Sequence, residues 1–129
     1  MLLSADLDLK LCDFGNACQM LAADERRFSR CGDIYFWAPE MVDPVSTGGY
    51  QSEVDYWALG VLLYKMITGH TPFFAQKKIN GQESKWEIIQ KIQDCVFDYP
   101  KDFEEKQPEL HNLIDNLLKK DPARRLTFE

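Results

Sequence analysis

The stretch SEVDYWALGVLLYKMI, residues 52–67, decides how this chain folds. Ser52 is a residue type that often caps a helix N-terminus, and an acid follows it. From residue 54 to residue 67, apolar side chains fall on every face of a helix. A helix that is hydrophobic all round is typical of a protein interior, so we expect it to lie in the middle of the molecule. Gly69 ends this helix, and Pro72 prevents the chain from resuming it.

Two further helices are predicted after this one. The first covers Ser84 to about Cys95, and its apolar stripe consists of Ile88, Ile89, Ile92 and Cys95. The second covers Pro108 to Lys119, and its apolar residues follow helical spacing at Leu110, Leu113, Ile114, Leu117 and Leu118. A polar linker over residues 76–83 separates the first of the three helices from the second.

The only convincing strand signal lies at the N-terminal end. Leu2 and Leu3, a polar turn over residues 4–6 and the alternating residues 7–12 predict one short β-hairpin, with Leu7 in its second strand. Residues 15–32 show no steady period, and such a stretch is usually a functional or a disordered loop. The expected fold class is therefore mainly α, with one hairpin, one long loop and three or more helices.

Composition and charge argue against several classes of protein. A net charge of -6 and a pI near 4.9 do not suit a nucleic-acid or anionic-membrane binder, which needs a basic stripe. The longest apolar run is far shorter than the roughly 20 residues that span a bilayer, and no signal peptide is recognisable. The 4 cysteines lack metal-ligand spacing, so reduced thiols are expected. We expect a cytoplasmic or nuclear protein with no nucleic-acid partner and no membrane span.

Four short motifs follow one another along the chain. They are Asp13-Phe14-Gly15, Ala38-Pro39-Glu40, the DYWALG of residues 55–60, and the DPARRL of residues 121–126. In this order and at these distances they closely resemble the motifs of the C-terminal lobe of eukaryotic protein kinases. The resemblance covers essentially the whole chain. It implies that residues 1–129 have the fold of this mainly helical lobe, which is one part of the α+β kinase domain.

The resemblance implies a cofactor site at the first motif. Asp13, Phe14 and Gly15 would contribute to the binding of ATP, and Asp13 would be a ligand of the Mg²⁺ that bridges the nucleotide phosphates. Gly15 would let the backbone swing, while Phe14 would pack under the site and set the direction of Asp13. The alternative is that Asp13 is simply an acid in a surface turn after an edge strand.

Residues 13–40 would be the activation segment, the loop that admits or blocks a protein substrate. Ser29 stands in the sequence RRFSR, where many related kinases carry an activating phosphosite and where a basophilic upstream kinase would find its preferred arginines. The alternative is a solvated loop serine. Gly32 matches the glycine that opens the substrate-facing loop. Asp33 follows where serine/threonine kinases usually have threonine, and its charge would repel the catalytic carboxylate.

The resemblance also implies structural roles. Glu40 and Arg125 would form a buried ion pair that ties the substrate loop to the helical base, and the residues that follow favour Arg125 over Arg124 as the partner. Asp55 would accept hydrogen bonds from the backbone of the catalytic loop, although stabilisation by the helix dipole is an alternative explanation. Trp57 would anchor the core.

Other parts of a kinase are not found in the sequence: a glycine-rich phosphate loop, a strand lysine and an H-R-D catalytic loop. Family spacing places the catalytic aspartate upstream of Met1, so we expect no catalytic residue within the chain. We therefore expect a partial kinase domain that lacks the N-terminal lobe and the catalytic loop. Because phosphoryl transfer needs several groups acting together, the isolated chain is expected to be inactive.

Leu59 and the TPFF of residues 71–74 favour serine/threonine over tyrosine specificity. The expected function is therefore part of a serine/threonine protein kinase resembling the AGC or calmodulin-dependent types. Such a transferase moves the γ-phosphate of ATP to hydroxyl groups of a protein substrate, and this part would supply the magnesium-binding motif, the activation segment and the substrate-side helices. The alternative is a truncated kinase or pseudokinase module that acts through protein–protein interaction.

Overall fold

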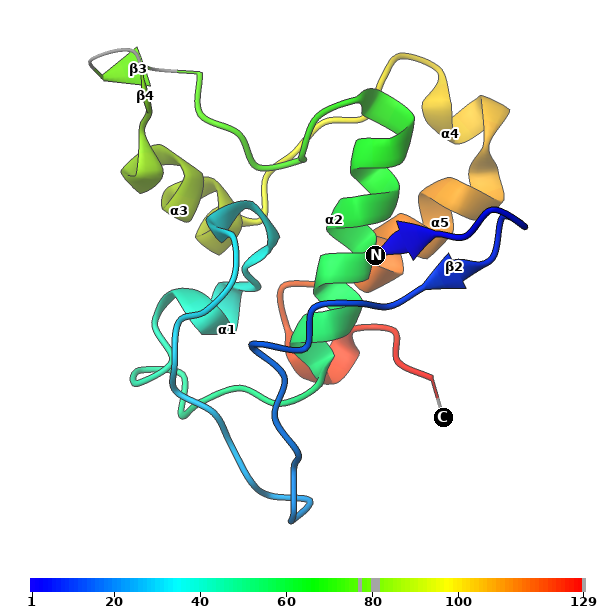
Figure 1. Ribbon diagram of the computed structural model, residues 1–129. Helices are drawn as coiled ribbons and strands as arrows, with labels where there is room; N and C mark the ends of the chain where they lie inside the picture. The colour runs from blue at the N-terminus through cyan, green and yellow to red at the C-terminus, as the bar shows by residue number, and fades with distance from the viewer. Residues whose placement is uncertain (77, 80–81, 129) are drawn as a thin grey trace.

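The computed structural model describes residues 1–76, 78–79 and 82–128 (Figure 1). In chain order the elements are β1 Leu2–Leu3, β2 Leu9–Lys10, the 3-10 helix η1 Ile34–Phe36, α1 Pro39–Val42, α2 Glu53–Thr68, β3 Lys78–Ile79, β4 Gln82–Glu83, α3 Lys85–Asp94, α4 Phe103–Lys106, α5 Pro108–Leu117 and the 3-10 helix η2 Pro122–Arg124. The strands form two separate antiparallel pairs, with Leu3 opposite Leu9 and Ile79 opposite Gln82. The predicted mainly helical class is confirmed.

Helix α2 is the element around which the others pack. It contacts α5 along one side and η1 on another, and Figure 1 shows it running through the middle of the helical body. Its buried residues are Trp57, Gly60, Val61 and Tyr64. Met66, however, is 73% exposed, so the expectation that every face of this helix is covered is wrong for its last turns. The apolar composition of the helix did not show which of its faces the described chain covers.

The two ends of α2 differ from each other in how well the sequence predicted them. Gly69 ends the helix in the left-handed region at φ +81° and donates its N–H to the carbonyl of Lys65, as its position predicted. Ser52 precedes the helix, but its backbone is already helical and its side chain makes no capping hydrogen bond. An N-cap needs an extended backbone to reach the free amides, so the prediction that Ser52 caps α2 is wrong.

Helices α3 and α5 confirm the periodicity argument. Ser84 caps α3 by accepting a hydrogen bond from the amide of Glu87, and Cys95 ends the helix in the left-handed region. On α5 the chain leaves the helical conformation at Leu118, slightly earlier than predicted, although Leu118 itself remains buried. The largest fully buried side chains of the core are those of Trp57, Val61, Phe73, Ile88, Ile92, Ile114 and Leu117.

Several short elements were not predicted. Helices α1 and α4 and the two 3-10 helices are too short to show a hydrophobic period, and the predicted polar linker holds the β3–β4 pair. Residues 77, 80 and 81 of that linker lie outside the described residues. At the N-terminal end, the hairpin is confirmed, but Leu7 has φ +65° and belongs to its turn rather than to its second strand.

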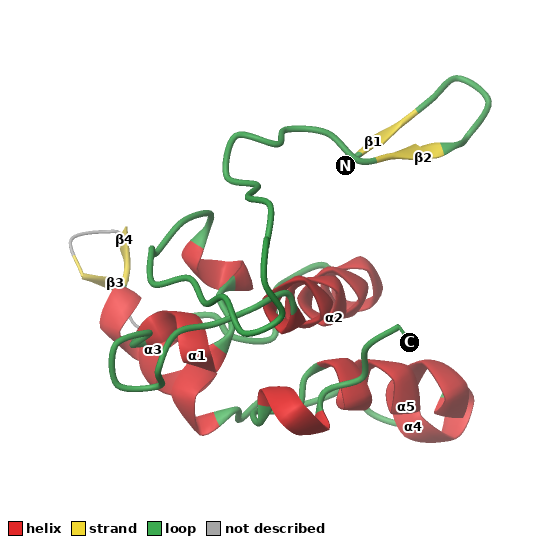
Figure 2. Ribbon diagram, turned by 90° about the horizontal axis from the view of Figure 1, so that it is seen from below, coloured by secondary structure: helices red, strands yellow, loops and turns green. Residues whose placement is uncertain are grey.

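The β1–β2 hairpin lies apart from the helices. Figure 2 shows it projecting from the helical body at the end of the long loop. Its leucines at positions 2, 3, 7, 9 and 11 are all more than half exposed. Within the described part of the chain, no helix is both long and apolar enough to span a bilayer.

Candidate functional site

Asp13 follows β2 with an unusual backbone conformation. Its φ is +65°, which is uncommon for a residue other than glycine and is tolerated best by aspartate and asparagine. The amide of Gly15 lies 3.4 Å from Asp13 Oδ1 and donates to it, so the carboxylate is held by its own motif. Backbone strain of this kind concentrates at functional sites, which makes Asp13 a candidate on structural grounds as well.

The surroundings of Asp13 differ from those expected. Phe14 is 69% exposed and does not pack under Asp13, so this expectation is wrong for the chain as it stands. The physical reason is that the whole segment from the hairpin to residue 19 lies at the surface, where the helical body offers no apolar contact. Two surface hollows are lined by residues 116–127, and neither includes Asp13.

A single carboxylate suits Mg²⁺ better than it suits most metals. Mg²⁺ is usually held by one or two carboxylates together with phosphate oxygens and water, rather than by a cage of protein ligands. Across the described residues no group of three or more His, Cys, Asp or Glu side chains is placed to hold a metal. Asp13 therefore fits one ligand position of a magnesium–nucleotide complex and no more than one.

The loop around Ser29 is anchored on the segment that precedes α2. Arg27 and Tyr50 exchange two backbone hydrogen bonds of 2.9 Å. The Tyr50 hydroxyl donates to the carbonyl of Ser29 at 2.6 Å, and burial raises the pKa of Tyr50. Gln51 adds two more hydrogen bonds, to the carbonyls of residues 23 and 25. The side chain of Ser29 is nevertheless exposed at the surface of this anchored loop.

The loop that begins at Gly32 has an acidic start. Gly32 takes φ +77°, and the Asp33 carboxylate accepts a hydrogen bond from the amide of Tyr35 at 3.2 Å, which caps η1. The Tyr35 hydroxyl donates to Glu83 of β4, and this acceptor is the main reason that the pKa of Tyr35 is raised to about 12. Sequence reasoning missed the contact between Tyr35 and Glu83, because no local pattern joins residues so far apart.

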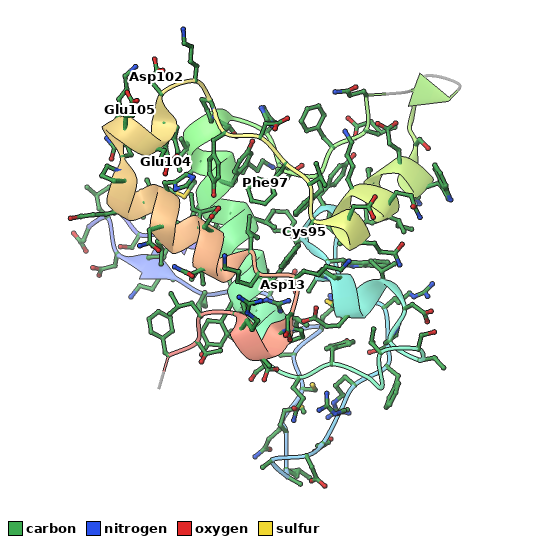
Figure 3. The ribbon with its side chains drawn as sticks, turned by 180° about the vertical axis from the view of Figure 1, so that it is seen from behind. Asp13, Cys95, Phe97, Asp102, Glu104 and Glu105 are labelled. Carbon is green, nitrogen blue, oxygen red and sulfur yellow. The ribbon has the colours of Figure 1, made fainter. Side chains whose placement is uncertain are left out.

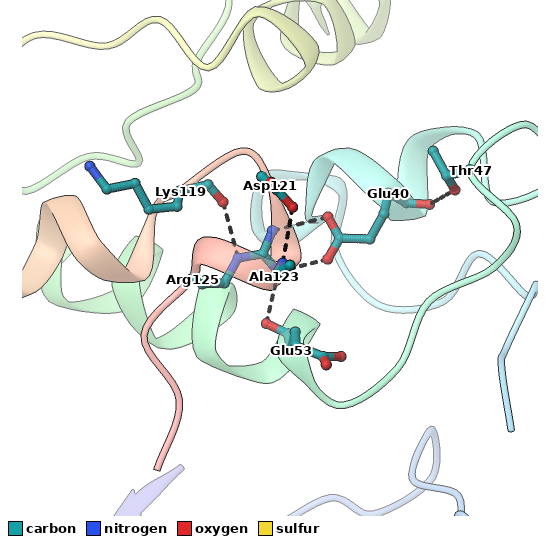
Figure 4. Close-up of polar contacts among 7 residues, drawn as sticks. All are labelled: Glu40, Thr47, Glu53, Lys119, Asp121, Ala123 and Arg125. Carbon is teal, nitrogen blue, oxygen red and sulfur yellow. Dashed lines mark hydrogen bonds and ion pairs between the residues drawn. The ribbon is translucent and has the colours of Figure 1, made fainter. Parts of the chain in front are cut away.

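Glu40 and Arg125 meet in a buried fork (Figure 4). Arg125 Nη1 lies 2.6 Å from Glu40 Oε1, and Nη2 lies 3.0 Å from Oε2, so the pair is bidentate. The guanidinium also donates to the carbonyls of Glu53 at 2.9 Å and Lys119 at 3.1 Å. Glu40 is 6% and Arg125 4% exposed. The contact that the resemblance implies is therefore present, with Arg125 rather than the exposed Arg124 as the partner.

Asp55 and Trp57 lie on the first turns of α2 with contrasting surroundings. Trp57 is fully buried, stacks on Phe73 at 5.4 Å, and lies under the guanidinium of Arg125 at 5.1 Å from its ring centre. The Asp55 carboxylate is exposed and makes no hydrogen bond or ion pair with the described residues, yet the protein around it raises its pKa by desolvation. The donors expected for Asp55 are thus not supplied by these residues.

Comparison with known proteins agrees with the fold. The family model described as "Protein kinase domain" matches residues 1–129. Similar curated proteins include ribosomal protein S6 kinase alpha-4 of Mus musculus, 35% identical over 127 residues, which are 98% of this chain and 15% of that protein. The probable serine/threonine-protein kinase CCRP1 of Zea mays is 32% identical over 129 residues, which are 100% of this chain and 19% of that protein.

A third relative is the serine/threonine-protein kinase PAK 4 of Mus musculus, 34% identical over 127 residues, which are 98% of this chain and 20% of that protein. The chain thus spans a fifth or less of the length of these relatives. A family match over the whole chain, together with the helical lobe and the buried Glu40–Arg125 fork, leads to one conclusion: the chain belongs to the protein kinase family.

Proposed function

We propose that residues 1–129 are the C-terminal-lobe part of a serine/threonine protein kinase domain that transfers the γ-phosphate of ATP to hydroxyl groups of a protein substrate. The observation that carries the proposal is the buried fork between Glu40 and Arg125, two motif residues separated by 85 positions. Glu40 and Arg125 belong to two of the four motifs, and their contact is the one that the resemblance implies. The relatives named as serine/threonine kinases support the choice of substrate hydroxyl.

In this proposal Asp13 is the magnesium ligand within the chain. The magnesium ion would draw charge from the phosphates of ATP during transfer. Asp13 is suited to the role because its carboxylate is exposed at the end of a strand and because its own motif fixes its orientation through the amide of Gly15. No other described carboxylate joins it in a metal cluster.

A further segment of the kinase, including the catalytic loop, would pack over the exposed face of the hairpin and α2. The Asp55 carboxylate has a raised pKa and lacks a partner among the described residues, so backbone amides of a catalytic loop would lower that pKa by donating hydrogen bonds to the ionised carboxylate. The exposed side chains of Leu9 and Phe14 would be buried by the same packing. Both features support a lobe that is completed from outside these 129 residues.

Ser29 is the proposed activating phosphosite, and its kinase would be a basophilic one. Ser29 is an exposed residue whose carbonyl accepts a hydrogen bond from Tyr50, and its hydroxyl lies 3.5 Å from the Tyr50 hydroxyl, so its position on the surface is fixed. A phosphate would add about -1.5 to -2 charges beside Arg26, Arg27 and Arg30, where charge-assisted hydrogen bonds would order the loop further.

A chimera tests the proposed function. Residues 1–129 replace the matching segment of the mouse PAK 4 relative, and phosphate transfer from magnesium-ATP to a basic peptide is measured. We expect Asp13→Asn to lower the rate by about two orders of magnitude or more, because the remaining groups cannot hold the metal and phosphates in place. Asp8→Asn, a change of the same kind in the exposed hairpin turn, should leave the rate within about twofold of the parent.

An active chimera that tolerates Asp13→Asn would contradict the assignment of the metal ligand. The isolated 129-residue chain is expected to transfer no phosphate under the same conditions, and measurable transfer would contradict the view that other segments are needed.

The alternative function, a non-catalytic interaction module, is favoured by Asp33. Its carboxylate is fixed by the amide of Tyr35 at the start of the substrate-facing loop, where threonine is usual in active serine/threonine kinases. Asp33→Thr in the chimera separates the two functions. If a folded, inactive chimera becomes active with threonine, this chain derives from a pseudokinase module. If the chimera is active with Asp33 present, the catalytic proposal is supported.

A further inference from the structure

A basic hollow lies where α5 ends and η2 begins. It is lined by Lys119, Lys120, Asp121 and Arg124 and is a shallow hollow, open to solvent, of about 550 Å³. The chain as a whole carries a net charge of -6, so a hollow lined by three cations and one acid has the opposite sign to the chain as a whole.

The three cations of the basic hollow are not used elsewhere in the described chain. None of them forms an ion pair there, whereas Arg125, the next residue, is fully committed to Glu40. The one acid in the hollow, Asp121, already accepts a hydrogen bond from the amide of Ala123 at 3.0 Å and caps η2 (Figure 4). The hollow therefore has a surplus of positive charge that no described side chain neutralises.

These cations are also not needed to neutralise the end of α5. Lysine and arginine near a helix C-terminus often bond to its last carbonyl groups. Here other donors occupy the carbonyls at the end of the helix and just beyond it: the amide of Leu126 bonds to Asn116 at 2.9 Å, the thiol of Cys95 to Leu118 at 3.3 Å, and the Nε of Arg125 to Lys119 at 3.1 Å. Figure 3 shows Cys95 where α3 ends and the connection to α4 begins.

The hydrogen bond from Arg125 to Lys119 has a second effect. It ties the turn that carries the hollow to the buried fork, so the backbone of the three cations is fixed before any ligand arrives. A preorganised site loses less conformational entropy when it binds. The exposed side chains of Lys120 and Arg124 remain free to reach a ligand.

We infer that the basic hollow is a docking site for a carboxylate-rich peptide segment of a protein partner. Its three cations outnumber its one acid, and the guanidinium of Arg124 can bind a carboxylate through two parallel hydrogen bonds. Three cations on one small hollow do not form the stripe that nucleic acids or anionic membranes need, and the acidic remainder of the chain would repel both. The site is separate from Asp13 and does not depend on the proposed kinase function.

Fluorescence polarisation tests the inference with the whole 129-residue chain. The probe is a labelled twelve-residue peptide that carries four glutamates among glycine and serine, and its match carries glutamine at the same four positions. We expect binding of the glutamate peptide only, with an affinity that falls as salt is raised. Lys120→Glu should weaken binding at least about tenfold. Lys101→Glu, which makes the same charge change at an exposed lysine away from the hollow, should weaken it less than about twofold.

Arg124→Gln is the second variant of the hollow, and melting curves confirm that each variant is folded. The inference is overturned if the chain does not bind the glutamate peptide, or if the glutamine peptide binds equally well. It is also overturned if Lys101→Glu weakens binding as much as Lys120→Glu does. A version of the peptide with phosphoserine in place of glutamate is run in parallel. Binding of that version alone would refute the choice of a carboxylate ligand.

Discussion

Replacing Arg125 by methionine should remove the largest single polar contribution that we can assign in this fold. The change takes away both donors to Glu40 and the donors to the carbonyls of Glu53 and Lys119. The side chain of Glu40 is 7% exposed and has no other donor among the described residues, so its charge would be left buried and unpaired. Loss of one partner of a buried ion pair costs about 3 to 5 kcal/mol. For a chain of this size that corresponds to a fall in melting temperature of about 10 to 20 °C.

Thermal unfolding followed by circular dichroism measures this cost. Arg124→Met is the matched control, because Arg124 is the neighbouring residue, is exposed and forms no ion pair in the described chain, and it should change stability by less than about 0.5 kcal/mol. Glu40→Gln should lower the free energy of unfolding by less than Arg125→Met does. The difference between the two losses should be about 1 to 2 kcal/mol, because the glutamine side chain still offers Arg125 a hydrogen-bond acceptor.

The combined variant with Glu40→Leu and Arg125→Met should be more stable than Arg125→Met alone, since neither charge is then left buried without its partner. Equal melting temperatures for Arg125→Met and Arg124→Met would refute the reasoning. So would a combined variant that loses the full sum of the two single changes, because an interacting pair cannot be additive.

Three further results are expected. In urea unfolding, Ser84→Ala should cost about 1 kcal/mol because Ser84 caps α3, while Ser52→Ala, which caps nothing, should cost less than about 0.5 kcal/mol; equal costs would contradict the cap assignment. Gly60→Ala should lower stability by about 1 to 3 kcal/mol, because the added Cβ would lie 2.9 Å from Leu117 Cβ; a more stable variant would mean that α2 and α5 are not in close contact. Burial and a carboxylate acceptor raise the pKa of Tyr99, so the neutral phenol stabilises the fold at pH values below the ordinary tyrosine pKa near 10, and this contribution is lost as the pH rises above it. Unfolding between pH 9 and 11 should therefore depend less steeply on pH in Tyr99→Phe than in the parent, and identical slopes would argue against the shift.

The long helices were predictable because local signals repeat within them. Helix α3 has an apolar stripe at helical spacing, and the structure buries Ile88 and Ile92 of that stripe. Helices α1 and α4 are too short for a period to appear, so nothing in their sequence distinguishes them from loops. Ser52 shows the limit of residue type as a signal, because capping depends on a backbone conformation that neighbouring elements impose.

The contacts of the candidate site were predictable only where a motif resembled one of a known protein family. No spacing rule places Glu40 against Arg125, and it was the resemblance to kinases that implied their contact. Tyr35 and Glu83 belong to no shared motif, so their hydrogen bond became visible only in the folded chain. The packing of Phe14 was wrongly expected, because burial depends on what covers a side chain and not on the residue alone.

The guanidinium of Arg125 makes hydrogen bonds to three parts of the molecule that lie far apart in the sequence. It binds the carboxylate of Glu40 in α1, the carbonyl of Glu53 at the first turn of α2, and the carbonyl of Lys119 beyond α5. Asp55 lies on the same first turn of α2 as Glu53. The hydrogen bond from Arg125 to the carbonyl of Glu53 therefore helps to position the exposed Asp55 carboxylate, although Asp55 takes no part in that bond. A change at Arg125 should therefore disturb α1 and the surface around Asp55 together, whereas loss of a contact confined to one of them would leave the other in place.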